Sequence, residues 1–258
     1  MRHVLVHYHI YKNSGTSFEN VLDASFGAKH ERFDGPYPFF TINQDQLDQI
    51  IERRKDAIAF STHQALLPQP SSTNFRVVAA MFLRHPILRL GSIYRYKRGS
   101  GDGTLTARLA TKHGFAGWIE ESFSHPTELT QISNPQTRYL AGVYGRQAIV
   151  DVRNDLLNYD LVTAKRNLSN VEMLGRTEFF DGDIHRFAKI AAGFGIRLRI
   201  PENCHHNATD VSTEPVDLRA EALLSKLPPT VRARLLAANR QDFELYGLAR
   251  DLIETRQT

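Results

Sequence analysis

The sequence predicts an α/β protein with a central, mainly parallel sheet flanked by helices. Apolar, β-prone runs at 4–10, 56–60 and 76–83 alternate with segments of helical periodicity. The run at 76–83 is apolar throughout, which is typical of a strand buried on both faces in the middle of a parallel sheet. We therefore expect a single domain over residues 1–258.

Local start signals and periodicity predict the remaining elements. The first predicted helix begins near Thr16. Further helices are predicted at 44–55, 86–97, 105–123, from 134 onward, at 181–194 and at 231–248. Two more short strands are predicted at 159–164 and 171–174. Pro86 and Pro135 suit the first helical position, where a missing N–H costs no hydrogen bond, and Asn134 suits the N-cap before Pro135.

The composition limits the class of partner and the location. A net charge of +4 suits an anionic ligand and is too small to indicate a nucleic-acid partner. No run approaches the roughly 18 apolar residues that a membrane span needs, and no signal-peptide pattern precedes the first strand. The single cysteine excludes an intramolecular disulfide and favours a reducing compartment. We therefore expect a cytoplasmic protein without a membrane span.

A candidate zinc ligand set stands at Cys204, His205 and His206. Adjacent histidines cannot easily bind the same ion, and the sequence has no second cluster at ligand spacing. The sequence therefore predicts no metal site.

The polar stretch between the first strand and the first helix is a candidate anion site. Its residues are Lys12, Asn13, Ser14, Gly15, Thr16 and Ser17. Thr16 followed by Glu19 fits a capping box, so we expect the helix to begin near Thr16 or Ser17. Free backbone N–H groups and the positive end of the helix dipole meet there, which favours a phosphate or a sulfate. The alternative is an ordinary strand-to-helix turn with a surface lysine.

The position of Lys12 separates this loop from the P-loop of nucleoside triphosphatases. That pattern places the lysine after its second glycine and directly before Ser or Thr. Here Lys12 precedes the only glycine, Gly15. A triphosphate cradle of the usual kind is therefore not predicted.

Two further strand ends carry candidate functional residues. In open α/β sheets the ligand lies beyond the carboxyl ends of the strands, and His63 and Arg84 follow the runs at 56–60 and 76–83. His63 is a candidate catalytic group, although a lone histidine also occurs as an ordinary core or surface residue. Arg84 is suited to bidentate phosphate binding. Ser92 lies about two turns into the helix that follows.

Two segments resemble the motifs of a known family. Residues 9–17 are similar to the signature His-Ile-Pro-Lys-Thr-Ala-Gly-Thr-Ser of sulfotransferases that use 3′-phosphoadenosine 5′-phosphosulfate. Residues 82–94, about 70 positions later, resemble the family's second motif, Leu-Arg-(Asp/His)-Pro-x-x-Arg-x-x-Ser-x-Tyr. The likeness is closest to the carbohydrate branch, with heparan and dermatan 2-O-sulfotransferases and many bacterial relatives. Further matches lie at 134–142, 164–168, 174–180 and 239–246.

The resemblance implies a P-loop-like three-layer fold and a role for each candidate residue. It implies that Lys12 and residues 13–17 bind the 5′-phosphosulfate, and that Arg84 and Ser92 bind the 3′-phosphate. It implies that His63 is the general base and that Lys12 stabilises the departing phosphosulfate oxygen. Sulfuryl transfer handled by a lysine and backbone donors requires no metal. The product nucleotide is 3′,5′-adenosine bisphosphate.

The chain departs from the family pattern at three positions. Tyr11 replaces the usual proline, Asn13 the usual threonine, and Thr62 stands where glycine is common.

Four weaker assignments concern the second half of the chain. Asn207 and Thr209 lie in a loop like one that lines the cofactor in relatives, and Gln136 and Arg138 are candidates to face the acceptor or to cap the site.

The sequence thus favours a sulfotransferase acting on a hydroxyl, with a saccharide as the expected acceptor. A nucleotide-dependent kinase or nucleoside triphosphatase is an alternative, disfavoured by the missing triphosphate pattern and the absence of a carboxylate pattern for Mg²⁺. A non-catalytic protein that binds nucleotides or sulfated glycans is a second alternative. The acceptor's identity and the oligomeric state stay open.

Overall fold

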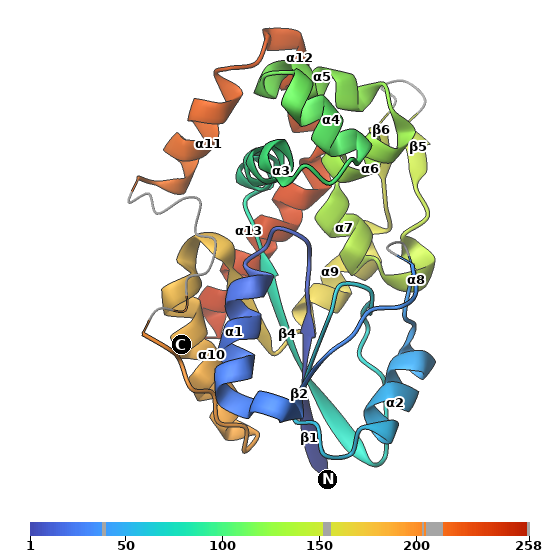
Figure 1. The fold of residues 1–258 in the computed structure, drawn as a ribbon, viewed down its shortest axis with the longest axis vertical. Helices are drawn as coiled ribbons and strands as arrows, with labels where there is room; N and C mark the ends of the chain where they lie inside the picture. Colours follow the sequence, from blue (N-terminus) through green and yellow to red (C-terminus); the bar gives the residue numbers. More distant parts are fainter. Residues whose placement is uncertain (38–39, 152–155, 203, 205–213, 257–258) are drawn as a thin grey trace.

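A five-stranded parallel sheet lies at the centre of the molecule (Figure 1). The computed structural model describes residues 1–37, 40–151, 156–202, 204 and 214–256. The strands are β1 (Arg2–Tyr8), β2 (His30–Arg32), β3 (Ala59–Thr62), β4 (Phe75–Leu83) and β7 (Met173–Arg176), in the order β2-β3-β1-β4-β7. All four pairings are parallel. A separate antiparallel pair is formed by β5 (Ile149–Asp151) and β6 (Leu156–Asn158).

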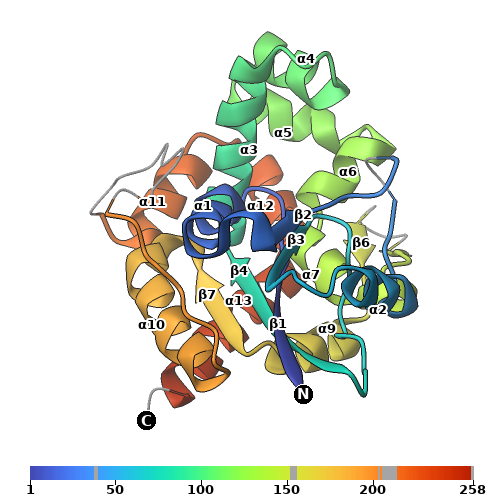
Figure 2. The ribbon, with the colours of Figure 1, turned by 60° about the horizontal axis from the view of Figure 1, so that its bottom comes forward.

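Alternate residues of the central strands support two different helical layers. The helices of these layers are α1 (Gly15–Phe26), α2 (Gln44–Arg53), α7 (Pro135–Leu140), α9 (Leu161–Ser169), α10 (Phe180–Gly193) and α13 (Arg240–Thr255). Leu5 packs with α1 and α10, whereas Val4 and Val6 pack with α2, α7, α9 and α13. Figure 2 shows these layers on opposite sides of the strands. The predicted three-layer α/β fold is confirmed.

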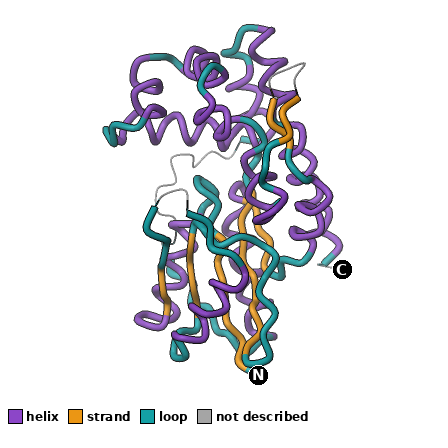
Figure 3. Tube along the Cα trace, turned by 90° about the vertical axis from the view of Figure 1, so that its right-hand side faces the viewer, coloured by secondary structure: helices purple, strands orange, loops and turns teal. Residues whose placement is uncertain are grey.

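A helical region lies beyond the carboxyl ends of the strands (Figure 3). It contains α3 (Pro86–Ser100), α4 (Leu105–Lys112), α5 (Phe115–Phe123), α6 (Pro126–Ile132), α11 (Val216–Leu224) and α12 (Pro229–Ala238). These helices share a hydrophobic cluster with the fully buried Trp118. The short α8 (Gly142–Gly145) and the 3₁₀ turns η1 (Gly27–Lys29) and η2 (Thr177–Phe179) complete the elements. Among the described helices, none has the length and apolar character needed to cross a membrane.

Two helix starts far apart in sequence cap each other. Asn134 lies before α7 as predicted, but its side-chain oxygen accepts from the backbone N–H of Gln241 at 3.0 Å, in the first turn of α13. In return, the Asp242 carboxylate accepts from the N–H groups of Gln136 and Thr137, at 3.1 and 2.7 Å. Each side chain accepts hydrogen bonds from backbone N–H groups of the other helix, so the N-terminal turns of α7 and α13 are held together.

The predicted helix over 231–248 is therefore wrong as a single helix. The chain breaks at Asn239, between α12 and α13. The amide of Asn239 donates to the carbonyl oxygens of Ile132 and Leu235, at 2.8 and 3.0 Å. Local helical periodicity cannot predict a break that depends on a contact with the distant carbonyl oxygen of Ile132.

Three other local predictions differ from the structure. The predicted helix over 105–123 is divided into α4 and α5, because the chain leaves the helical conformation at His113 and Gly114. The predicted strand at 159–164 is the start of α9, where the Asp160 side chain caps the helix by accepting from the N–H of Thr163 at 2.9 Å. The capping box of Thr16 and Glu19 is absent, because α1 already begins at Gly15. The Glu19 carboxylate contacts His9 instead.

Candidate active site

The loop between β1 and α1 presents an uncapped helix start. Lys12 and Ser14 adopt positive φ angles of 65° and 59°, a conformation that costs free energy in residues other than glycine. Ser14 makes no side-chain capping bond, and the first turn of α1 carries no acidic residue. The N–H groups of that turn have no acceptor within the helix. The strained loop thus leaves backbone donors and the helix dipole for an external anion.

Two arginines hold the backbone of this loop. Nη1 of Arg84 donates to the carbonyl oxygen of Lys12, and Nε of Arg89 donates to that of Tyr11, both at 3.1 Å. Arg84 follows β4 and Arg89 lies in the first turns of α3, and both are largely buried, at 7% and 3% exposure. The carbonyl oxygens are therefore turned into the protein.

The side chain of Asn13 also points inward. Its Nδ2 donates to the carbonyl oxygen of Phe82 at 2.9 Å and to Oε1 of Gln136 at 2.7 Å. The Gln136 amide in turn accepts from the backbone N–H of Arg84 and donates to the Arg84 carbonyl oxygen. Asn13 and Gln136, both almost inaccessible, thus tie the loop to the end of β4.

The imidazole of His9 occupies the space beside Gly15. A Cβ atom built on Gly15 would lie 1.8 Å from Nε2 of His9, so any side chain at this position would have to displace the imidazole. The Nδ1 atom of His9 lies 2.8 Å from Oε1 of Glu19. Burial opposes ionisation of Glu19, but the hydrogen bond with His9 lowers the pKa of its carboxyl, which keeps it an acceptor. His9 therefore lies locked between Gly15 and Glu19.

His63 follows β3 and faces the same loop. Its Nδ1 lies 2.9 Å from the carbonyl oxygen of His9, and the two rings are 3.8 Å apart, centroid to centroid. A carbonyl oxygen can only accept, so Nδ1 carries the proton and the lone pair is on Nε2. Oδ1 of Asp34 accepts from the backbone N–H of His63 and from the hydroxyl of Thr62, both at 2.9 Å, and fixes the turn.

Burial and neighbouring charges shift the pKa values of Lys12 and His63. Burial, followed by the charges of Arg84 and Arg95, lowers the pKa of Lys12 to about 8. Burial, followed by the charge of His9, lowers the pKa of His63 below its ordinary value. At neutral pH these shifts favour a neutral imidazole beside a lysine that is still mostly protonated.

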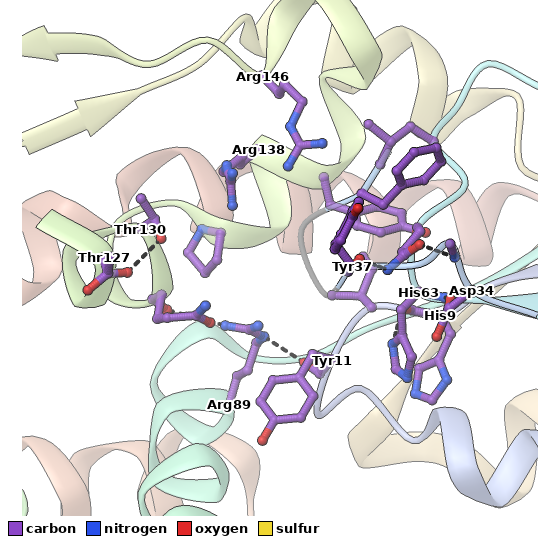
Figure 4. A pocket seen from close by; sticks show the side chains of 18 of the residues that line it. His9, Tyr11, Asp34, Tyr37, His63, Arg89, Thr127, Thr130, Arg138 and Arg146 are labelled. Atoms are coloured by element: carbon purple, nitrogen blue, oxygen red, sulfur yellow. Dashed lines mark hydrogen bonds between the residues drawn. The ribbon is translucent and has the colours of Figure 1, made fainter. Parts of the chain in front are cut away.

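A cavity of about 1050 Å³ opens beside His63 (Figure 4). His63 and His9 form one wall, and Arg89 and Tyr11 lie at its base. Asp34 and Tyr37, from the loop between β2 and α2, lie beside His63. Across the cavity lie Thr127 and Thr130 of α6, Arg138 of α7 and Arg146 at the end of α8. The cavity therefore has one basic wall and one imidazole wall.

Comparison with known proteins matches this architecture to a family. The model of the sulfotransferase family that carries the description "Sulfotransferase family" matches residues 1–249. This chain belongs to the sulfotransferase family. An uncharacterized protein from Archaeoglobus fulgidus is 30% identical to this sulfotransferase over 267 residues, which cover 97% of each chain. Transfer of a sulfuryl group is the activity that the family supports.

The structure brings most of the predicted site residues of the sulfotransferase together. Lys12 contacts Arg84 through its carbonyl oxygen, and His63 is joined to Gly15 through His9. Ser92 lies on α3, buried at 2% exposure. Of the two acceptor candidates, Arg138 lines the cavity and Gln136 is fully buried. Asn207 and Thr209, with His205 and His206, lie outside the described residues.

The sequence analysis gave no role to several residues that shape the sulfotransferase site. Two of them are Arg89 and Tyr96, which share one face of α3 with Ser92, the residue assigned to the 3′-phosphate, at the spacing i, i+3 and i+7. That spacing is the local signal for Arg89. Glu178 lies within a matched segment, and its carboxylate accepts from the backbone N–H of His85 at 3.1 Å and approaches Arg84 at 3.7 Å. No local pattern predicts that contact.

Among the residues that the structure describes, one group of side chains could hold a metal ion. Ligand atoms of His7, His9 and Glu19 all lie within 4.8 Å of one another. His7 contacts the hydroxyl of Ser61 at 3.2 Å, and His9 and Glu19 are hydrogen-bonded to each other. An ion would therefore have to replace the bond between His9 and Glu19.

Proposed function

We propose that this sulfotransferase transfers the sulfuryl group of 3′-phosphoadenosine 5′-phosphosulfate to a hydroxyl of a saccharide, with residues 1–258 acting as one domain. The observation that supports this most directly is the pairing of His63 with the carbonyl oxygen of His9. It leaves the Nε2 lone pair of His63 available at a cavity wall, next to an uncapped helix start.

The residues of the β1–α1 loop fit an anionic nucleotide. Donors come from the first turn of α1, from the hydroxyls of Ser14, Thr16 and Ser17, and from the Lys12 ammonium. Arg84 and Arg95 add positive charge close to Lys12, and Ser92 lies on the same helix as Arg95. We assign the 5′-phosphosulfate to the loop and the 3′-phosphate to Arg84 and Ser92. When bound, the nucleotide supplies the activated sulfuryl group.

In this proposal, His63 takes the proton of the acceptor hydroxyl. The proton passes to Nε2 as the acceptor oxygen bonds to sulfur, while Nδ1 stays bound to the His9 carbonyl oxygen. The lowered pKa of His63 keeps the imidazole neutral and ready to accept. Asp34 holds the backbone of His63, so the ring does not have to reorient.

Lys12 has the complementary role. The bond between sulfur and the phosphate oxygen breaks, and negative charge grows on that oxygen. The protonated Lys12 ammonium stabilises this charge in a partly buried setting, where an ion pair is stronger than in water. The position of Lys12 supports this role, since it lies in the loop three residues before the start of α1.

The basic wall of the cavity supports an acceptor that carries negative charge. Arg146 contacts the hydroxyl of Thr41, and burial, followed by the charge of Arg138, lowers the pKa of Arg146. Two guanidinium groups that repel each other favour an anion between them. Within the described residues, neither has an ion pair with a carboxylate.

Calorimetry separates this proposal from the alternatives. We expect 3′,5′-adenosine bisphosphate to bind at least tenfold more tightly than ADP with Mg²⁺. Tighter binding of ADP would contradict the proposed sulfotransferase mechanism and favour a kinase-like one. Transfer is then measured with radiolabelled sulfate donor and a panel of saccharides. Nucleotide binding without transfer to any of them would favour a non-catalytic binding protein.

A further inference from the structure

One face of α3 runs along the β1–α1 loop. Arg89 and Tyr96 are seven residues apart on this helix, with Ser92 between them on the same face. Arg89 fixes the carbonyl oxygen of Tyr11. Two turns later, the ring of Tyr96 meets the ring of Tyr11 edge-on, with centroids 6.2 Å apart and an interplanar angle of 79°. The helix thus contacts both the backbone and the side chains of the loop.

The Lys12 ammonium lies over the ring of Tyr96. Its Nζ is 4.2 Å from the ring centroid, within the range of a cation–π interaction. Within the described part of the chain, no carboxylate forms an ion pair with Lys12. The charged groups that act on it are the guanidinium groups of Arg84 and Arg95, which repel it. Among these groups, the face of the Tyr96 ring is therefore the one that attracts the Lys12 ammonium.

Tyr11 contributes its ring and not its hydroxyl. The hydroxyl oxygen of Tyr11 is buried and has no hydrogen-bond partner among the described residues. A buried hydroxyl without a partner costs free energy, so the benefit of a tyrosine here comes from aromatic contact. The rings of Tyr11 and Tyr96 meet in the favoured T-shaped geometry.

We propose that Tyr96 is a positioning residue for Lys12, which it holds by a cation–π contact while Tyr11 braces the Tyr96 ring. The inference rests on the proposed function only in that Lys12 is the group that stabilises the leaving oxygen. It explains the tyrosine at position 11, which departs from the family pattern.

The contact has a consequence for the charge of Lys12. Its pKa of about 8 lies close to neutral pH, so a modest change alters the protonated fraction. The electron-rich ring stabilises the ammonium form against the repulsion from Arg84 and Arg95. Loss of the π system is expected to lower the pKa of Lys12 by about one unit. At pH 7.5 this reduces the protonated fraction roughly threefold.

The test compares Tyr96→Phe with Tyr96→Leu. Phenylalanine keeps the aromatic face, and leucine keeps apolar bulk without it. The pKa of Lys12 is read from its acetylation by acetic anhydride as a function of pH, followed by peptide mass spectrometry. We expect Tyr96→Leu to lower the pKa by about one unit and Tyr96→Phe to leave it within about 0.3. Tyr144→Leu, at a tyrosine that is 92% exposed, is the matched control.

The sign of the change decides between two physical roles. If the ring only excluded water, Tyr96→Leu would leave the pKa unchanged or raise it, and either result overturns the proposal. Tyr96 is 50% exposed, so the protein should tolerate these changes, and Tyr96→Met provides a second non-aromatic variant if Tyr96→Leu fails to fold. Tyr96→Met must show the same fall in pKa.

Transfer assays add a second readout. In Tyr96→Leu, the alkaline limb of kcat should move to lower pH, with a fall in kcat that exceeds any rise in KM for the nucleotide. Tyr96→Phe should restore the wild-type profile. The labelling experiment needs neither nucleotide nor acceptor. Failure of the calorimetric test would therefore reject the proposed function alone, whereas an unchanged pKa in Tyr96→Leu would reject the cation–π role alone.

Discussion

The Nδ1 atom of His63 lies 2.9 Å from the carbonyl oxygen of His9, and the two imidazole rings contact each other at a tilt of 33° with centroids 3.8 Å apart. His9 in turn packs on Gly15 at the start of α1. The position of the proposed base is thus set by the same loop that offers the anion site. These contacts hold the base and the donor loop in a fixed relative position, which favours a productive geometry.

Replacement of His63 tests the base directly. His63→Ala should lower the rate of sulfuryl transfer by roughly 10²–10⁴, because the acceptor hydroxyl loses its proton acceptor. The affinity for 3′,5′-adenosine bisphosphate, measured by calorimetry, should change less than about twofold. His185→Ala, on an exposed residue of α10, is the control. A tenfold loss of nucleotide binding with normal turnover would refute the assignment.

The pH dependence of kcat/KM should be bell-shaped. His63 must be neutral, and its pKa is lowered by burial and by His9, so the acid limb should fall below about pH 6.5. Lys12 must be protonated, and its pKa of about 8 sets the alkaline limb, with activity lost as the pH rises through that value. Rates are measured from pH 5 to 9.5 at constant ionic strength. Undiminished kcat/KM at pH 9.5 would contradict the role of Lys12.

Gly15→Ala should displace the His9 ring. The new Cβ would lie 1.8 Å from Nε2 of His9, so His9 must leave Glu19 and His63. We expect transfer to fall at least tenfold and urea to unfold the variant at lower concentration. Gly247→Ala, a helical glycine with open space around it, should be neutral or stabilising.

A double variant identifies the cause of the Gly15 effect. If the clash with His9 is responsible, Gly15→Ala combined with His9→Ala should be no less stable than His9→Ala alone. Simple additivity of the two losses would point to another cause.

The reciprocal caps predict a large effect at Asp242. Asp242→Ala removes the acceptor of the Gln136 and Thr137 N–H groups and of the Thr137 hydroxyl, and it should lower the free energy of unfolding by about 2–4 kcal/mol. Asp242→Asn keeps one acceptor oxygen, so its free energy of unfolding should fall by less than that of Asp242→Ala. Asp251→Ala removes an exposed carboxylate and should stay within about 0.5 kcal/mol. Equal losses in Asp242→Ala and Asp251→Ala would refute the capping role.

Arg146 tests the charge of the acceptor. Arg146→Gln should raise KM roughly tenfold or more for a saccharide that bears a carboxylate, because a charge-assisted hydrogen bond is lost. KM for the matching neutral saccharide should hardly change. Arg232→Gln, in an exposed ion pair with Glu221, provides the control for loss of surface charge. Equal effects on both saccharides would argue against an anion subsite.

Local signals in the sequence determined the core of the fold and the loop. The apolar run that became β4 and the prolines that open α3 and α7 were recognisable because burial and helix starts act on neighbouring residues. The same holds for the glycine and lysine between β1 and α1, whose spacing predicted an anion loop and resembled the family signature. Hydrophobic periodicity failed at α9 and at the break between α12 and α13, where side-chain caps determine the boundary.

Only the tertiary structure decided what the polar side chains do. It turned Asn13 and Gln136 into internal ties, placed Arg89 under Tyr11, and selected the Nε2 lone pair of His63 through a carbonyl oxygen 54 positions away. It also set the ring of Tyr96 under Lys12. A side chain's hydrogen bonds and pKa depend on groups that the folded sheet brings close, and sequence spacing does not specify them.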